Sequence, residues 1–180
     1  MPFFLKKKFD IIVLARNKKK LKKFGWFKKV KFQKLDLDDK KTWNIKTLKS
    51  SSLIHLAWQG LPNFGNSSHL KKNLKSNYEF IKYMIKKGAT DILITGTCLE
   101  YGKYNGKLYS NQKTFPEIPY AKAKDILRKK VQNLTNKKMI IFKWARLFYI
   151  FGKGQNKRSL IPDLENTIKQ KKKIFKMSKG

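Results

Sequence analysis

Cysteine is almost absent from this sequence, since Cys98 is the single one among 180 residues. One thiol cannot form a disulfide within the chain or supply a cysteine-based zinc cluster. We therefore expect no metal site and a reducing compartment, the cytoplasm. Long apolar runs are missing as well, because no stretch approaches the roughly 18 residues that cross a bilayer. No membrane partner is expected.

Acidic residues are scarce too, with 11 Asp and Glu against 44 Lys and Arg, which gives a formal net charge of +33. Such a charge attracts phosphate without sequence specificity, and it keeps a basic nucleic-acid-binding protein as the alternative function. Arginine reads bases and phosphates with its bidentate fork. It is rare here, however, and lysine is spread along the whole chain. We interpret the excess as a lysine-rich solvent surface, with nucleic acid an unlikely partner.

Short runs rich in Val, Ile and Leu alternate with longer segments of helical period. This order predicts an α/β fold, with a parallel sheet and crossover helices. The predicted strands are 10–15, 30–35, 53–57, 91–95 and 139–144. The predicted helices are 18–24, 39–48, 69–87 and 120–135. Gly88 supplies a stop just past the third helix.

Tyr120 and Lys124 lie four residues apart in the segment Pro-Tyr-Ala-Lys-Ala-Lys that starts at Pro119. On a helix both side chains share one face, about 5–6 Å apart at Cβ. Lowering a tyrosine pKa from about 10 to neutrality takes roughly 4 kcal/mol. A lysine charge about 5 Å away supplies roughly 3 kcal/mol at an effective dielectric near 20. Taken alone, the pair also fits an ordinary exposed helix start.

About 20 residues upstream, a predicted strand ends in Ile-Thr-Gly-Thr-Cys-Leu-Glu-Tyr-Gly at 94–102. This segment, followed by Pro-Tyr-x-x-Ala-Lys, resembles the extended short-chain dehydrogenases/reductases, the NAD-dependent epimerases and dehydratases of nucleotide sugars. The resemblance implies hydride transfer with Tyr120 as acid/base, while Lys124 lowers its pKa and holds the cofactor ribose. It places Thr97, four residues before Tyr101, on the reacting sugar oxygen. A threonine that caps the turn after a strand is the alternative for Thr97.

Other segments resemble the family in the correct order and imply contacts with NAD or NADP. The end of the strand at 53–57 would pass beneath the ribose and pyrophosphate, Asp-Leu at 36–37 would lie beside the adenine, and an asparagine would begin the long helix. The residues concerned are Asp36, Leu37, Leu56, Ala57, Trp58 and Asn73. Arg16 follows the first predicted strand, where an arginine pairs with the extra phosphate of NADP and so favours NADP. An exposed arginine at a helix start is the alternative.

The resemblance implies a partial NAD(P)-binding Rossmann domain at 1–150 and the start of a sugar-nucleotide domain at 151–180. No Gly-x-x-Gly-x-x-Gly occurs in the 180 residues. We therefore expect a sheet without its first strand and phosphate loop, cut at both ends, that binds dinucleotides weakly. Such a chain would be an oxidoreductase fragment for surface polysaccharide synthesis, completed by upstream sequence, a homo-oligomer or another chain. An inactive remnant remains open.

A thiol nucleophile at Cys98 with His55 or His69 as base is a further arrangement to weigh. Cys98 is more simply a small residue at a strand end. We expect His55 to be a satisfied core residue, and His69 to open a helix.

Overall fold

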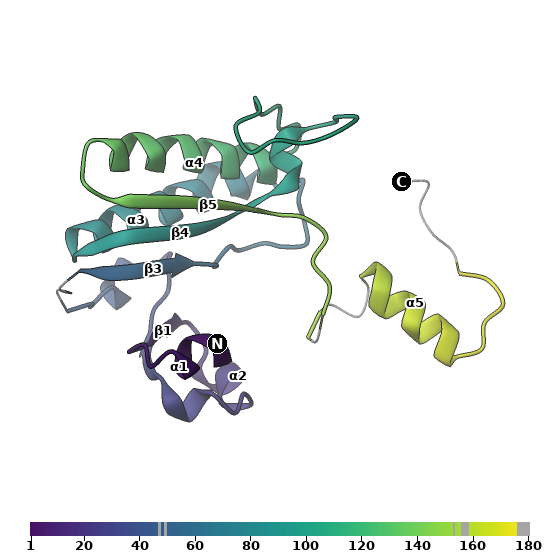
Figure 1. Cartoon of the computed structure of the whole chain (residues 1–180), viewed down its shortest axis with the longest axis horizontal. Coiled ribbons are helices and arrows are strands. Elements are labelled where there is room, and N and C mark those ends of the chain that lie inside the picture. The colour runs from purple at the N-terminus through teal and green to yellow at the C-terminus, as the bar shows by residue number, and fades with distance from the viewer. Residues whose placement is uncertain (47, 49, 153, 156–158, 176–180) are drawn as a thin grey trace. The chain divides into compact units, whose positions relative to one another are not determined.

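The computed structural model describes residues 1–46, 48, 50–152, 154–155 and 159–175. The chain divides into two compact units, Met1–Arg146 and Leu147–Gly180. Figure 1 shows the helices and strands of both. The larger unit holds all the residues with which the predicted site is built.

The predicted strands are all present, with ends moved by a few residues, and they form two parallel sheets. In the first sheet β1 (Ile12–Ala15) pairs in parallel with β2 (Lys31–Lys34). In the second, β4 (Ala89–Thr97) lies between β3 (Ser51–His55), which is parallel to it, and β5 (Ile141–Leu147). The α/β class is therefore confirmed, while the expected single sheet falls into two in the part of the chain that is described (Figure 1).

The long helices of the larger unit pack on β4 and against each other. They are α3 (Leu74–Lys86) and α4 (Pro119–Asn136), and a π-helical turn, η3 (His69–Asn73), leads into α3. The fixed φ of Pro119 suits the first position of α4. After α3 the chain turns at Gly88, whose φ of +104° is unfavourable for other residues. The helices predicted at 69–87 and 120–135 are therefore confirmed.

Two short helices lie near the amino terminus, α1 (Pro2–Lys6) and α2 (Lys18–Lys22). The second corresponds to the helix predicted at 18–24. The Asn17 side chain caps it by accepting from the Lys20 N–H at 3.2 Å.

The predicted helix at 39–48 is wrong, because among its described residues, 39–46 and 48, only a 3-10 turn, η2 (Lys40–Thr42), forms. Side chains bind the backbone in its place: the Thr42 hydroxyl accepts from the Asp36 N–H at 2.8 Å, and the Trp43 indole donates to the Asp36 carbonyl at 2.7 Å. Such local bonds compete with a helical ladder. They turn the Trp43 ring into the core, where it is 8% exposed.

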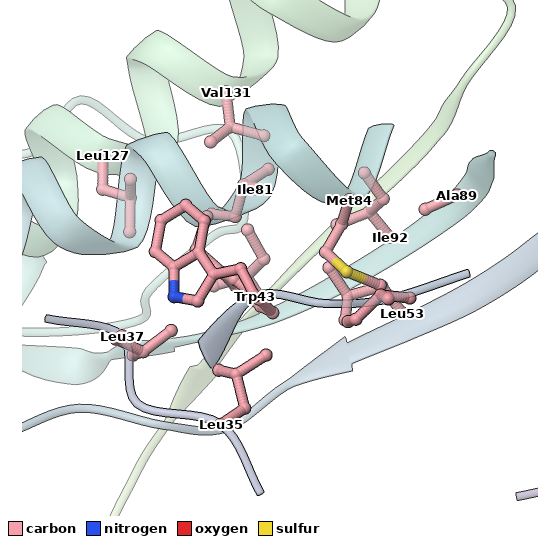
Figure 2. Packing of buried hydrophobic residues seen from close by; sticks show 13 residues of the cluster. Leu35, Leu37, Trp43, Leu53, Ile81, Met84, Ala89, Ile92, Leu127 and Val131 are labelled. Atoms are coloured by element: carbon pink, nitrogen blue, oxygen red, sulfur yellow. The ribbon is translucent and has the colours of Figure 1, made fainter. Parts of the chain in front are cut away.

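The hydrophobic core joins α3 and α4 to β3 and β4 (Figure 2). Its buried members are Leu35, Leu37, Trp43, Ile45, Leu53, Phe80, Ile81, Met84, Ala89, Ile92, Ile94, Leu127 and Val131. Ile81 and Met84 are among the buried residues that α3 contributes. This packing fixes the start of α4 against β4 and so sets the position of Tyr120.

The smaller unit contains the helix α5 (Leu160–Lys169). The compact units divide between Arg146 and Leu147, close to the domain boundary expected after residue 150. The assignment of the smaller unit to a substrate domain stays a prediction. Within the described residues, no helix has both the length and the apolar character to cross a membrane.

Candidate functional site

Thr97 ends β4 and caps the 3-10 helix η4 (Cys98–Tyr101) that follows it. Its hydroxyl accepts from the Leu99 N–H at 3.3 Å, and Glu100 accepts from the Thr97 N–H at 2.8 Å. This reciprocal pair is a capping box. The capping role that the sequence left open for Thr97 is thus present. It uses the hydroxyl as an acceptor, so the hydroxyl hydrogen can still donate to another oxygen.

Lys124 points into the protein from the first turns of α4 and is 1% exposed. Its Nζ donates to the carbonyl of Thr95 on β4 at 2.7 Å and lies 4.2 Å from the centroid of the Trp58 ring. Burial lowers the pKa of Lys124 to about 8, against the opposing charge of Glu100. The lysine therefore does not behave as an exposed residue of a lysine-rich helix.

Tyr120, one turn before Lys124, is 8% exposed and lies among aromatic rings. Its ring centroid is 5.9 Å from Trp58, 5.4 Å from Phe64 and 5.4 Å from His69. Burial, together with the charges of Glu100 and Cys98, raises the pKa of Tyr120 to about 12.

This pKa differs from the sequence expectation that Lys124 lowers it. No hydrogen bond within the described residues joins the Tyr120 hydroxyl to Lys124 or Thr97, since the lysine donates to Thr95 instead. The cost of burying the phenolate therefore exceeds the attraction of the ammonium. Tyr120 holds its proton at neutral pH in this structure.

His69 is fully buried beside Tyr120, which the sequence prediction of a simple helix start missed. Its Nδ1 accepts from the Trp58 indole at 3.1 Å and from the Asn73 amide at 3.1 Å. The indole can only donate, so the ring proton lies on Nε2, which donates to the Asn63 carbonyl at 2.7 Å. The loop after β3 is thereby tied to η3.

Glu100 is fully buried and was also missed. Besides the Thr97 N–H it accepts from the Arg146 Nε at 2.8 Å and from the Trp144 indole at 3.0 Å, both on β5. A Cβ at Gly96 would collide with the Trp144 indole and the Glu100 carboxylate, so glycine is required there. A sequence does not distinguish a buried carboxylate from an exposed one. The glycine at position 96 was the one hint in the sequence that side chains pack closely at the end of this strand.

His55 ends β3 as a buried core residue, as predicted, and its Nε2 donates to the Asn77 amide oxygen at 2.6 Å. Burial lowers its pKa to about 4; the Asn77 hydrogen bond opposes this shift, and the charge of Lys124 adds to it. Cys98 is half-buried in η4. Neither the surroundings of His55 nor those of Cys98 support a thiol nucleophile with a histidine base.

The predicted cofactor residues fall into two groups. Trp58 and Asn73 lie with Tyr120 around His69, and Lys124 lies over the Trp58 ring. The remaining ones are not in that cluster: Arg16 is exposed after β1, and Asp36 accepts from the Asp38 N–H at 3.0 Å. Leu37 is a core residue, which leaves only its backbone to a ligand, whereas Leu56 and Ala57 are exposed past the end of β3.

A parallel α/β fold with a threonine closing one strand, and a buried Tyr-x-x-x-Lys pair opening the next helix, has the layout of a short-chain dehydrogenase/reductase core. The chain belongs to the NAD dependent epimerase/dehydratase family, whose sequence profile matches residues 1–180.

Known relatives agree with this assignment. The dTDP-6-deoxy-L-talose 4-dehydrogenase (NAD(+)) of Aggregatibacter actinomycetemcomitans is 29% identical over 129 residues, which is 71% of this chain and 47% of that protein. Solved structures share the fold. A UDP-glucose 4-epimerase matches 94% of this chain and 56% of its own, with a TM-score of 0.73 and 18% identity.

A dTDP-glucose 4,6-dehydratase from Streptomyces venezuelae, solved with NAD bound, matches 90% of this chain and 53% of its own. Its TM-score is 0.71 at 16% identity. The chain therefore spans about half the length of the relatives that it matches.

Proposed function

We propose that this chain carries the acid/base half of an NAD-dependent oxidoreductase that acts on the hexose of a nucleotide sugar. The observation that carries the proposal is the burial of Tyr120 and Lys124 on one face of α4, which packs against β4 and the η4 turn that follows it. The family and the nucleotide-sugar enzymes among its relatives support the same substrate class.

In the proposed reaction Tyr120 moves the proton of the reacting sugar hydroxyl, and NAD, when bound, supplies the hydride acceptor. The residues present fit a dinucleotide, because Lys124 uses one hydrogen of its ammonium on Thr95 and has others for ribose hydroxyls. The Thr97 hydroxyl orients the sugar oxygen. Tyr120 must accept this proton as a phenolate, so a positive charge nearby has to lower its raised pKa before the hydride leaves.

NAD is the cofactor proposed for this site, as in the talose dehydrogenase relative. Arg16, exposed after β1, supports NADP as the other candidate, because an arginine there can pair with the 2′-phosphate. The same proposal places the protein in the cytoplasm and gives it a role in surface polysaccharide synthesis. It also holds that a homo-oligomer or another chain completes the site.

Ligand-observed NMR of the 180-residue chain with NAD, NADP, dTDP-glucose and UDP-glucose tests the binding part. We expect weak dinucleotide binding that K124M abolishes. The matched control is K122M, because Lys122 is exposed two residues earlier on the same helix. Equal binding by K124M and wild type would remove Lys124 from the site.

Formation of NADH from dTDP-6-deoxyhexoses, followed at 340 nm, tests the chemical part. Loss of one proton-transferring group costs about 10²–10⁴-fold in rate. Y120F should therefore lower any turnover by that factor, whereas Y104F, at an exposed tyrosine, should not. Turnover by Y120F at the wild-type rate would contradict the assignment of Tyr120.

A further inference from the structure

Trp58 stands between the two residues of α4 that the proposed function uses. Its ring face lies 4.2 Å from the Lys124 Nζ, and the Tyr120 ring meets it nearly edge-on, at 5.9 Å and 72°. We propose that Trp58 is a positioning residue, which keeps the Lys124 ammonium charged and oriented in a site closed to water. The functional meaning of this contact rests on the proposed function; the contact itself does not.

Lys124 needs such a partner because it is 1% exposed and its one hydrogen bond among the described residues goes to the neutral carbonyl of Thr95. A buried ammonium without compensation loses its proton. The nearby carboxylate, Glu100, is already bound by Arg146, Trp144 and the Thr97 N–H. The face of an indole ring attracts a cation without competing for the lysine hydrogens, and the attraction is strongest when water is excluded.

The indole is itself held in place from two segments. The indole N–H donates to His69 Nδ1. This histidine nitrogen also accepts from the Asn73 amide, which in turn donates to the Gln59 carbonyl at 2.9 Å. The ring therefore has a fixed tilt over the lysine. Tyr120 packs on both Trp58 and His69, so this arrangement also fixes the tyrosine ring.

The titratable groups around Lys124 come from three elements. Glu100 of η4 raises its pKa, His55 of β3 interacts with its charge, and Tyr120 lies one turn earlier on α4. Burial lowers the pKa of Lys124 to about 8. Trp58 stabilises the protonated form, so removal of the ring should move this pKa further down.

The test is the titration of the Lys124 Cε resonance between pH 6 and 11, with the signal assigned by its loss in K124M. W58L should lower the midpoint by about 0.5–1.5 pH units, the size of a desolvated cation–π contact. W58F keeps a ring face and should shift it less. W26L is the control, because Trp26 stacks on Phe24 in the amino-terminal segment.

A second measurement avoids any loss of folding in W58L. Wild-type protein with fluorinated tryptophans keeps the shape of the ring but weakens its attraction for cations, so the midpoint should fall as fluorine content rises. An unchanged midpoint in both W58L and the fluorinated protein would overturn the proposal. The titration needs no cofactor, so a failure to bind NAD would count against the proposed function and leave the role of Trp58 standing.

Discussion

Glu100 holds the end of β4 to β5 through a buried charge. Its carboxylate is fully buried, with the Arg146 Nε at 2.8 Å and the Arg128 Nε at 3.9 Å. Glutamine at this position would remove the counter-charge of Arg146, whereas Arg128 would keep Asp125 at 2.7 Å. We expect E100Q to lower the free energy of unfolding by about 3–5 kcal/mol, the usual cost of breaking a buried pair. Urea denaturation measures it.

The control for this substitution is E79Q. Glu79 lies on the surface of α3, with Lys40 and Lys82 at 3.7 and 3.6 Å. Exposed pairs at such distances contribute about 0–1 kcal/mol. Equal losses in E100Q and E79Q would show that the burial of Glu100 has no energetic weight.

His55 should make the protein sensitive to mild acid. Its pKa is about 4 in the folded state and 6.5 in the unfolded chain, so only the unfolded chain binds this proton between those values. The free energy of unfolding therefore falls as the pH drops through this window. Between pH 7.5 and pH 5 the loss should be about 2 kcal/mol. Urea midpoints of wild type and H55N at both pH values measure this loss, because H55N lacks the contribution of His55 to the pH dependence of stability. An equal pH dependence in the two proteins would contradict the prediction.

Among the elements, those with strong apolar patterns were predictable. The strands could be predicted because short runs rich in Val, Ile and Leu are typical of buried strands. The helix α4 could be predicted because Pro119 marks its start. The predicted helix at 39–48 failed because its polar side chains bind the Asp36 backbone, a competition that periodicity does not reveal. The division into two sheets depends on pairing between distant segments, which no local pattern contains.

The candidate site was predictable only in part. Tyr120, Lys124 and Thr97 stand at a spacing that the family resemblance identifies, and the structure buries all of them. His69 and Glu100 were missed, because a sequence does not show which polar side chains become buried. The direction of the Tyr120 pKa was also missed: it depends on desolvation, which the Coulomb estimate for Lys124 did not include.

The turn from α3 into β4 depends on Gly88. A Cβ there would collide with the Leu48 carbonyl, and the φ of +104° is strained for any other residue. Such backbone strain costs about 1–3 kcal/mol before the collision is counted. G88A should lower the unfolding free energy by at least that amount in urea titrations.

The control for this turn is G25A, because a Cβ at Gly25 has no neighbour within 4 Å. It should stay within about 0.5 kcal/mol of wild type. A G88A protein as stable as G25A would mean that the turn can adopt another conformation.

At the scale of the whole molecule, the net charge of +33 opposes folding by self-repulsion. Salt shortens the Debye length from about 10 Å at 0.1 M to about 3 Å at 1 M. We therefore expect the thermal unfolding midpoint to rise with NaCl. A variant with K71E, K75E and K122E, all at exposed positions, should respond less. A midpoint that falls with salt would show that local ion pairs outweigh the general repulsion.

The two sheets differ in how well they exclude water, and amide hydrogen exchange should separate them. No residue of β1 or β2 is buried, whereas five of the nine residues of β4 are. Backbone hydrogen bonds near solvent open in small local fluctuations, while those of a central strand exchange only when the whole core opens. Amides of β1 and β2 should thus lose protection first. A ligand bound by Arg16 or Asp36 would then register as slowed exchange in this pair of strands, before any change in global stability.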